Sequence, residues 1–345
     1  MNNRLLFLDS IRGIAALIVV LSHIIEMSVD NGINVYFLGD LYHAIDIGRL
    51  GVIVFFLLSG FVIPMSLKKR SGGEILNFGL KRFFRLYPVY WFSIIFAAII
   101  GVGFGVEVIN VQQVLMNFTM IHKFFGYESV IAAYWTLHLE LIFYVLCALL
   151  FKLGIYEIRK YSYAFSLVFM VFAILLSLLR YYFGIKVPVV MALGLSCMFL
   201  GAYFNYLLSI DNKEGYSKFY ILVSVFFIAL YISHSYYYQE GWLRWYLSYV
   251  ASFLVFFSMV TYLKINNKWV CLLGDVSYSL YLLHSVVIGL VFLYFSKYFD
   301  KDVAFIYLSL VIIFSSILLS YVTYRLIEVP FQVVGGRITK ALRKK

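Results

Sequence analysis

The feature that most constrains this chain is a series of ten apolar runs, each about as long as a membrane is thick. A helix that crosses the hydrocarbon core needs about 20 mostly apolar residues. Lipid offers no partner for backbone polar groups, so each run should be helical. With short connections the runs use almost the whole chain of 345 residues. They lie at residues 11–29, 48–66, 87–105, 134–151, 163–182, 188–207, 219–233, 244–263, 277–295 and 303–327.

Composition supports a membrane protein over a soluble one. Hydrophobic residues make up 63% of the chain and charged residues 13%, whereas soluble domains average about 45–50% and 25%. The net charge is +11. Its charged residues sit between the apolar runs, where membrane topology explains most of them, so the charge gives no reason to expect a nucleic-acid partner. We expect an all-α, polytopic membrane bundle of about ten transmembrane helices in the inner or plasma membrane. Residues 1–345 would form one membrane-embedded domain without a separate soluble domain.

The distribution of Lys and Arg predicts the orientation of the bundle. Cytoplasmic segments next to membrane helices carry an excess of these residues. If the N-terminus is cytoplasmic, inner segments hold 21 of the 28 Lys and Arg, and outer segments hold 7. An even number of crossings returns the chain to the side on which it began. The sequence therefore predicts that both termini are cytoplasmic.

Three cysteines, Cys147, Cys197 and Cys271, are spread along the chain. Their number is odd, and the first two lie inside apolar runs, so we expect neither a disulfide framework nor a metal site.

The first apolar run contains ionisable residues, which are costly in lipid and therefore indicate function. Arg12 and His23 are 11 residues apart, about 16 Å along a helix at 1.5 Å per residue. His23 would then lie in the outer half of the membrane, and Glu26 would share its helix face. A histidine can take a proton from a hydroxyl near neutral pH, and a carboxylate can orient it. The alternative is a structural histidine that bonds between helices.

Basic residues gather on the inner side before the third apolar run. Lys81, Arg82 and Arg85 precede Pro88, and guanidinium groups bind phosphates in bidentate geometry. Membrane anchoring explains the same charges equally well.

A second charged group is expected at the inner interface near the C-terminal end. Arg325 and Glu328 are three residues apart and should form a helical ion pair.

A further carboxylate, Glu140, falls in the fourth expected helix. At membrane depth it must be paired or hydrated. It could pair with Arg49 or Arg180, orient His23, or contact an acceptor molecule. A purely structural salt bridge is the alternative.

The ninth expected helix carries a polar stripe. Ser277, Tyr281 and His284 are spaced i, i+4 and i+7, which places them on one helix face. Asp275 is the expected N-cap of this helix. The stripe either lines a channel or bonds between helices.

Five segments in order resemble motifs of the acyltransferase-3 family of membrane proteins. Together they cover residues 8 to about 331 of the chain. The first resembles the family's first helix, in which an Arg-Gly pair precedes a histidine, and the third resembles its Arg-x-x-Arg-x-x-Pro motif. The segments are LDSIRGIAA at residues 8–16 with His23, FFLLSGF at 55–61, RFFRLYP at 82–88, WTLHLE at 135–140 and SYSLYLLH at 277–284.

The resemblance implies a membrane O-acyltransferase that moves an acyl group, often acetyl, from acyl-coenzyme A to a hydroxyl. The acceptors of such enzymes are cell-surface glycans, lipid-linked sugars or small molecules. The family's essential histidine corresponds to His23, which would act as general base or form an acyl-histidine.

The remaining expected roles come from the residue patterns together with the resemblance. Glu26 and Glu140 would assist catalysis. Acetyl-CoA or another acyl-CoA would be the donor, and no metal is implied. The expected donor-binding residues are Arg12, Lys81, Arg82 and Arg85, and the expected channel-lining residues are Ser277, Tyr278, Tyr281 and His284.

Three alternatives stay open at this point. A transporter or flippase for a lipid-linked sugar would also bury His, Arg and Glu in a helical bundle, although the chain lacks the internal symmetry common in transporters. A non-catalytic membrane scaffold would tolerate the loss of His23. An enzyme of the same family could transfer succinyl or another acyl group instead of acetyl.

Overall fold

The computed structural model describes residues 6–36, 38–67, 73–103, 110–210, 213–238, 241–295 and 301–342. Within these residues ten helices are long and apolar enough to cross a membrane, and no strand is present. The all-helical, ten-span prediction is therefore confirmed. The Lys and Arg residues at positions 4, 68–70, 297 and 343–345, which were counted for the orientation, lie outside the described residues. The side of the membrane on which the termini lie stays a prediction.

The chain divides into two compact units, each formed by separate stretches of sequence. The first unit comprises residues 1–42, 76–138 and 265–345, and the second comprises residues 43–75 and 139–264. The prediction of one membrane-embedded domain over the whole chain stays a prediction. The helices of the first unit are α1 (Leu6–Asp30), α4 (Glu74–Gly103), α5 (Val111–Asn117), α11 (Lys268–Phe295), α12 (Lys301–Thr323) and α13 (Val329–Leu342).

The second unit contains the middle of the chain. A short helix, α2 (Leu38–Ala44), leads into it, and α6 (Trp135–Lys152) begins in the first unit and continues in the second. Its other helices are α3 (Ile47–Val62), α7 (Ile158–Phe183), α8 (Val189–Ile210), α9 (Lys213–Tyr238) and α10 (Trp242–Ser258).

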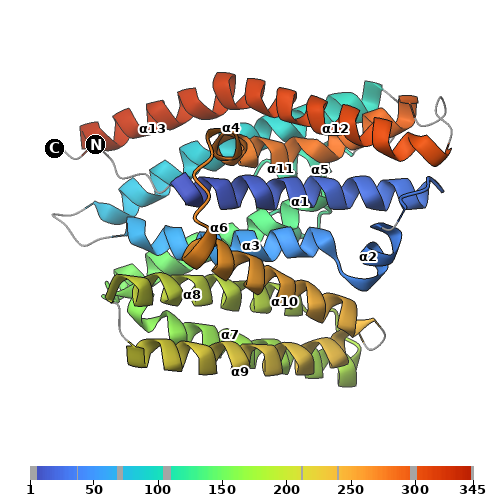
Figure 1. Ribbon diagram of the computed structural model, residues 1–345. Coiled ribbons are helices and arrows are strands. Elements are labelled where there is room, and N and C mark those ends of the chain that lie inside the picture. Colours follow the sequence, from blue (N-terminus) through green and yellow to red (C-terminus); the bar gives the residue numbers. More distant parts are fainter. Residues whose placement is uncertain are drawn as a thin grey trace. The chain divides into compact units, whose positions relative to one another are not determined.

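In the first unit, α1 and α11 run side by side in the same direction (Figure 1). The pairs Ser10–Cys271 and His23–His284 keep one sequence offset of 261 residues along the two helices. Glycines permit this close approach: a Cβ on Gly13 would lie 2.7 Å from the Gly274 nitrogen. Successive membrane spans alternate in direction, so two spans run parallel when their positions in the series differ by an even number. This agrees with α1 as the first span and α11 as the ninth.

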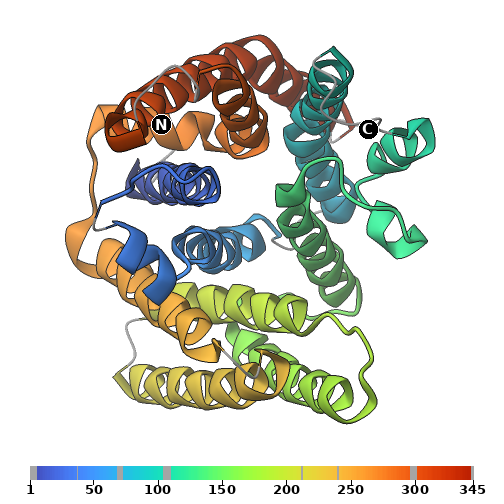
Figure 2. The ribbon, with the colours of Figure 1, turned by 90° about the vertical axis from the view of Figure 1, so that its right-hand side faces the viewer.

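In the second unit, α8 packs closely against α3 (Figure 2). A Cβ on Gly201 would overlap the carbonyl of Leu57, and a Cβ on Gly60 would overlap that of Met198. Gly60 belongs to the FFLLSGF segment, so the backbone contact between two helices explains its glycine physically. Most of α8 is buried, from Ala192 to Asn205 without interruption.

Two helices begin more than two turns earlier than hydropathy predicts. The third span starts at Glu74 instead of residue 87, and the ninth at Lys268 instead of residue 277. Asp275 is therefore inside α11, and its prediction as N-cap is wrong. The cap is Asn267, whose side chain accepts a hydrogen bond of 2.9 Å from the Trp269 amide. Helices that extend beyond the hydrocarbon core carry polar turns, which an apolar window does not detect.

Candidate active site

An open cavity of about 820 Å³ lies in the first unit. Its walls come from the last turns of α1, from α4, from residues 130–132 and from the second half of α11. Aliphatic side chains form most of the lining. The polar residues in the walls are His23, Glu26, Asp30, Asn31 and Ser285.

His23 and Glu26 form a hydrogen-bonded pair in this cavity. They are one helical turn apart on α1, and His23 Nδ1 lies 2.8 Å from Glu26 Oε2. Their side chains are 40% and 48% exposed, so both are accessible from the cavity. A neutral imidazole that donates Nδ1–H to a carboxylate keeps its lone pair on Nε2. The pair therefore has the arrangement of a general base and the group that orients it.

His284 of α11 supports the same ring. The centroids of the His23 and His284 rings are 5.3 Å apart. His284 is fully buried, with Nδ1 3.1 Å from the Leu280 carbonyl and Nε2 3.3 Å from the Ser285 hydroxyl. The structure thus brings together three of the predicted site residues: His23, Glu26 and His284.

Of the other predicted channel-lining residues of α11, two bond to neighbouring helices and one bonds within α11. The Tyr281 hydroxyl lies 2.8 Å from Thr136 Oγ1, and Tyr278 donates to the Leu86 carbonyl at 2.9 Å. Ser277 bonds within its own helix to the Gly274 carbonyl. Tyr278 thus holds α11 against α4, and Tyr281 holds it against the start of α6. The role of all three residues as channel lining stays a prediction.

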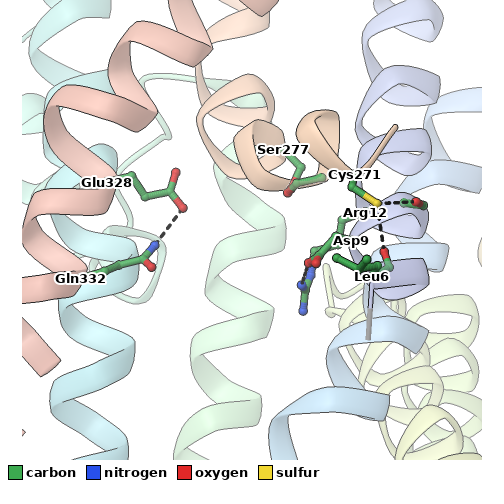
Figure 3. A network of polar contacts seen from close by, with 9 residues as sticks. Leu6, Asp9, Arg12, Cys271, Ser277, Glu328 and Gln332 are labelled. Atoms are coloured by element: carbon green, nitrogen blue, oxygen red, sulfur yellow. Dashed lines mark hydrogen bonds and ion pairs between the residues drawn. The ribbon is translucent and has the colours of Figure 1, made fainter. Parts of the chain in front are cut away.

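The predicted donor-binding residues lie in the same unit but away from the cavity. Arg12 donates to Asp9 at 2.9 Å near the start of α1 (Figure 3). On α4, Lys81 is exposed and Arg82 lies over the Phe78 ring at 5.3 Å. Arg85 precedes the cavity-lining Ala97 by 12 residues, about 18 Å along a helix at 1.5 Å per residue. A ligand that touched both places would need to be long.

Glu328 lies near this group of basic residues, whereas the sequence predicted that it pairs with Arg325. It is 3% exposed and accepts hydrogen bonds from Ser279 at 3.0 Å and from Gln332 at 3.1 Å (Figure 3). Arg85 is near enough to interact with it electrostatically. The predicted Arg325–Glu328 surface pair is therefore wrong, since Arg325 is exposed and the carboxylate turns inward.

Two signals could have identified Glu328. It stands between apolar neighbours in the stretch LIEVPF at residues 326–331, and Gln332 follows at i+4. A short π-helix, Tyr324–Glu328, joins α12 to α13 at this point, and such turns are frequent at functional sites.

Glu140 belongs to the second unit. It accepts a hydrogen bond from the Tyr144 hydroxyl, one turn further along α6. The two arginines considered as its partners bond elsewhere: Arg49 lies 3.6 Å from Asp46 and over the Trp245 ring, and Arg180 lies over Tyr237. Its relation to His23 stays a prediction.

Within the part of the chain that the structure describes, no group of three His, Cys, Asp or Glu side chains is arranged to hold a metal ion. Cys147, Cys197 and Cys271 are buried thiols and form no disulfide with one another.

Comparison with known proteins identifies the family. The model of the family Acyl_transf_3, described as an acyltransferase domain, matches residues 5–325. Among curated proteins, the acyltransferase MdmB of Streptomyces mycarofaciens is 26% identical over 160 residues, which cover 44% of this chain and 40% of MdmB. The chain thus aligns with less than half of that relative. No solved structure matches. With nearly its whole length matched by the family model, and with ten helices among its described residues that are long and apolar enough to span a membrane, the chain belongs to the acyltransferase-3 family of membrane acyltransferases.

Proposed function

We propose that this protein is an O-acyltransferase that moves an acetyl group from cytoplasmic acetyl-CoA to a hydroxyl of a glycan, a lipid-linked sugar or a similar acceptor at the cell membrane. The observation that carries the proposal is the His23–Glu26 pair, half-exposed in an open cavity. An ionisable pair at membrane depth is costly, and a hydrogen-bonded, accessible imidazole is what proton transfer from a hydroxyl requires.

The chemistry follows from the geometry of the pair. The acceptor hydroxyl gives its proton to His23 Nε2 while its oxygen attacks the thioester carbonyl of the donor. Glu26 stabilises the imidazolium that forms. When the tetrahedral intermediate collapses, the carbon–sulfur bond breaks and His23 returns the proton to the leaving thiolate. One ester forms, one thioester is lost, and free coenzyme A is released.

The donor would occupy the basic end of the same unit. On α4, Arg85 follows Arg82 by three residues and Lys81 by four, so the three can hold the phosphates of coenzyme A together. The pantetheine arm is long and thin, which suits the separation between this group and the cavity. Arg12 would brace the first turns of α1 through Asp9.

The test measures thiol release from acetyl-CoA by the purified protein in detergent, with and without acceptor. General-base catalysis typically contributes about 10²- to 10⁴-fold, so His23→Ala should lose activity by about that factor. His43→Gln is the matched control, because His43 is an exposed histidine of α2. Full acceptor-dependent activity in His23→Ala would refute the proposal.

Two further comparisons separate the parts of the proposal. Arg85→Ala should raise the KM for acetyl-CoA more than it lowers kcat, because it removes a contact made before the reaction starts. Succinyl-CoA offered beside acetyl-CoA shows which acyl group the enzyme uses, and faster turnover of succinyl-CoA would overturn the acetyl assignment alone.

A further inference from the structure

A second hollow, in the second unit, has a lysine on each of two helices and aliphatic residues further along the same two helices. It is an open groove of about 560 Å³ between α7, α8 and α9. We propose that this groove binds one anionic phospholipid, with the phosphate on Lys160 and Lys218 and the acyl chains along the aliphatic wall. The proposal is independent of the acyl-transfer chemistry.

The order of residues along the helices carries the proposal. Lys160 and Leu167 both line the groove from α7, and Lys218 and Val225 line it from α9. Each lysine precedes its aliphatic partner by seven residues, which is two helical turns on one face, or about 10 Å. Both helices begin at the same end of the unit, since α8 connects them by one return crossing. The groove therefore changes from cationic to apolar in the same direction along both walls, as a phospholipid does.

Tyrosines occupy the boundary between the two zones. Tyr163 and Tyr203 have ring centroids 5.7 Å apart, and Tyr203 and Tyr206 stack at 6.3 Å. All three line the groove. Tyrosine is enriched where the hydrocarbon core meets the headgroups, because its ring is apolar and its hydroxyl is polar. This position fixes the headgroup level between the lysines and the aliphatic wall.

The charges in the groove are available to a ligand. Lys218 is exposed and makes no ion pair with any residue that the structure describes. Lys160 lies 3.3 Å from Glu157, but both side chains are exposed, at 45% and 64%, and exposed pairs contribute little. Basic pockets between transmembrane helices bind anionic headgroups. The aliphatic wall is itself uncovered, with Ile221 62% exposed.

The experiment uses the full-length protein in detergent and measures lipid binding by native mass spectrometry. The probes are dioleoylphosphatidylglycerol, dioleoylphosphatidylcholine and glycerol phosphate. We expect phosphatidylglycerol to bind more tightly than phosphatidylcholine, and glycerol phosphate not to bind, because it lacks the chains. The double substitution Lys160→Gln and Lys218→Gln should weaken phosphatidylglycerol binding by about tenfold or more.

A matched control removes the same charge elsewhere. Lys152 and Lys264 are exposed lysines of the same unit that do not line the groove, so Lys152→Gln with Lys264→Gln should bind phosphatidylglycerol like the wild type. The pair Lys160→Arg and Lys218→Arg should also keep binding. Equal loss in the control, or equal binding of both phospholipids by the wild type, would overturn the proposal.

A second measurement covers the case in which the Gln variant does not fold. A photoactivatable phosphatidylglycerol should label wild-type peptides from residues 160–167, 203–210 or 215–225. Labelling confined to other peptides would also overturn the proposal.

Discussion

His23 and His122 are both histidines of the first unit, but their surroundings give them different properties. His23 is 40% exposed and bonded to a carboxylate. His122 is fully buried, lies 2.9 Å from the Ser129 hydroxyl through Nε2, and packs against the His138 ring at 4.5 Å. Exposure and a carboxylate partner suit proton transfer, whereas full burial beside a serine hydroxyl and a second imidazole suits a structural histidine.

The burial of His122 predicts a pH dependence of stability. Burial, followed by the nearby His138 and Lys123, lowers the pKa of His122 from 6.5 to about 4. The unfolded chain therefore binds a proton at a higher pH than the folded chain does. Stability should be constant above pH 6.5 and fall between pH 6.5 and 4, by up to about 1.4 kcal/mol per pH unit.

The measurement is the melting temperature in detergent between pH 7.5 and 5, compared in the wild type and His122→Gln. The variant should show a flatter profile in this window. Glu128, whose pKa is lowered by its hydrogen bond to Lys123, adds a loss of stability only below its ordinary pKa of 4.5. Parallel profiles in the two proteins would show that His122 is not the titrating group.

The buried carboxylate of Glu328 should contribute to stability through its two hydrogen bonds. Glu328→Ala leaves the buried Ser279 hydroxyl and the Gln332 amide without their acceptor, which should cost about 1–3 kcal/mol of stability. Glu328→Gln keeps an acceptor oxygen and should cost less. Arg325→Ala is the control, because that side chain is exposed. Melting temperatures in detergent give the order, and a Glu328→Ala protein as stable as the wild type would contradict the assignment.

At the scale of single helices, adjacent glycines of α13 offer a matched test of packing. A Cβ on Gly335 would lie 2.7 Å from the Cβ of Phe84 on α4, whereas a Cβ on Gly336 would meet nothing within 4 Å. Gly335→Ala should destabilise by about 1–3 kcal/mol through overpacking. Gly336→Ala should be neutral or stabilising by up to about 1 kcal/mol, because alanine favours helix.

The readout is again thermal stability, with the KM for acetyl-CoA as a second measurement. Phe84 neighbours Arg85 on α4, so displacement by Gly335→Ala should also raise this KM if Arg85 binds the donor. A Gly336→Ala protein that is less stable than Gly335→Ala would show that α13 does not pack on Phe84.

Hydropathy predicted all ten spans but not where α4 and α11 begin. The apolar core of each span is visible because lipid accepts nothing else. The turns before it, such as those from Glu74 to Leu86 in α4, mix apolar residues with four charged ones, so their hydropathy does not mark them as part of a span. The His23–Glu26 pair could be predicted because both residues are on one helix. The His23–His284 contact could not be predicted, because its two residues are more than 200 apart in sequence. The inward turn of Glu328 could not be predicted either, because its partner Ser279 is about 50 residues away in sequence.

At the scale of the whole chain, the ten spans are shared between two units that alternate along the sequence. The half-exposed His23–Glu26 pair and the basic residues of α4 belong to the first unit, and the proposed lipid groove belongs to the second. Acyl transfer from a cytoplasmic donor requires the basic end of the first unit to face the cytoplasm. The orientation predicted from Lys and Arg is therefore a condition of the proposed function.

This orientation can be tested by labelling single cysteines in intact cells. The native cysteines are 0%, 0% and 8% exposed, so their background reaction with a membrane-impermeant maleimide should be low. Lys123→Cys, in an exposed loop between α5 and α6, should react from outside the cell. Lys152→Cys and Arg337→Cys, both at exposed positions on the side predicted to be cytoplasmic, should react only after the membrane is permeabilised. The opposite pattern would place the basic residues of α4 outside the cell, where no cytoplasmic acyl-CoA could reach them.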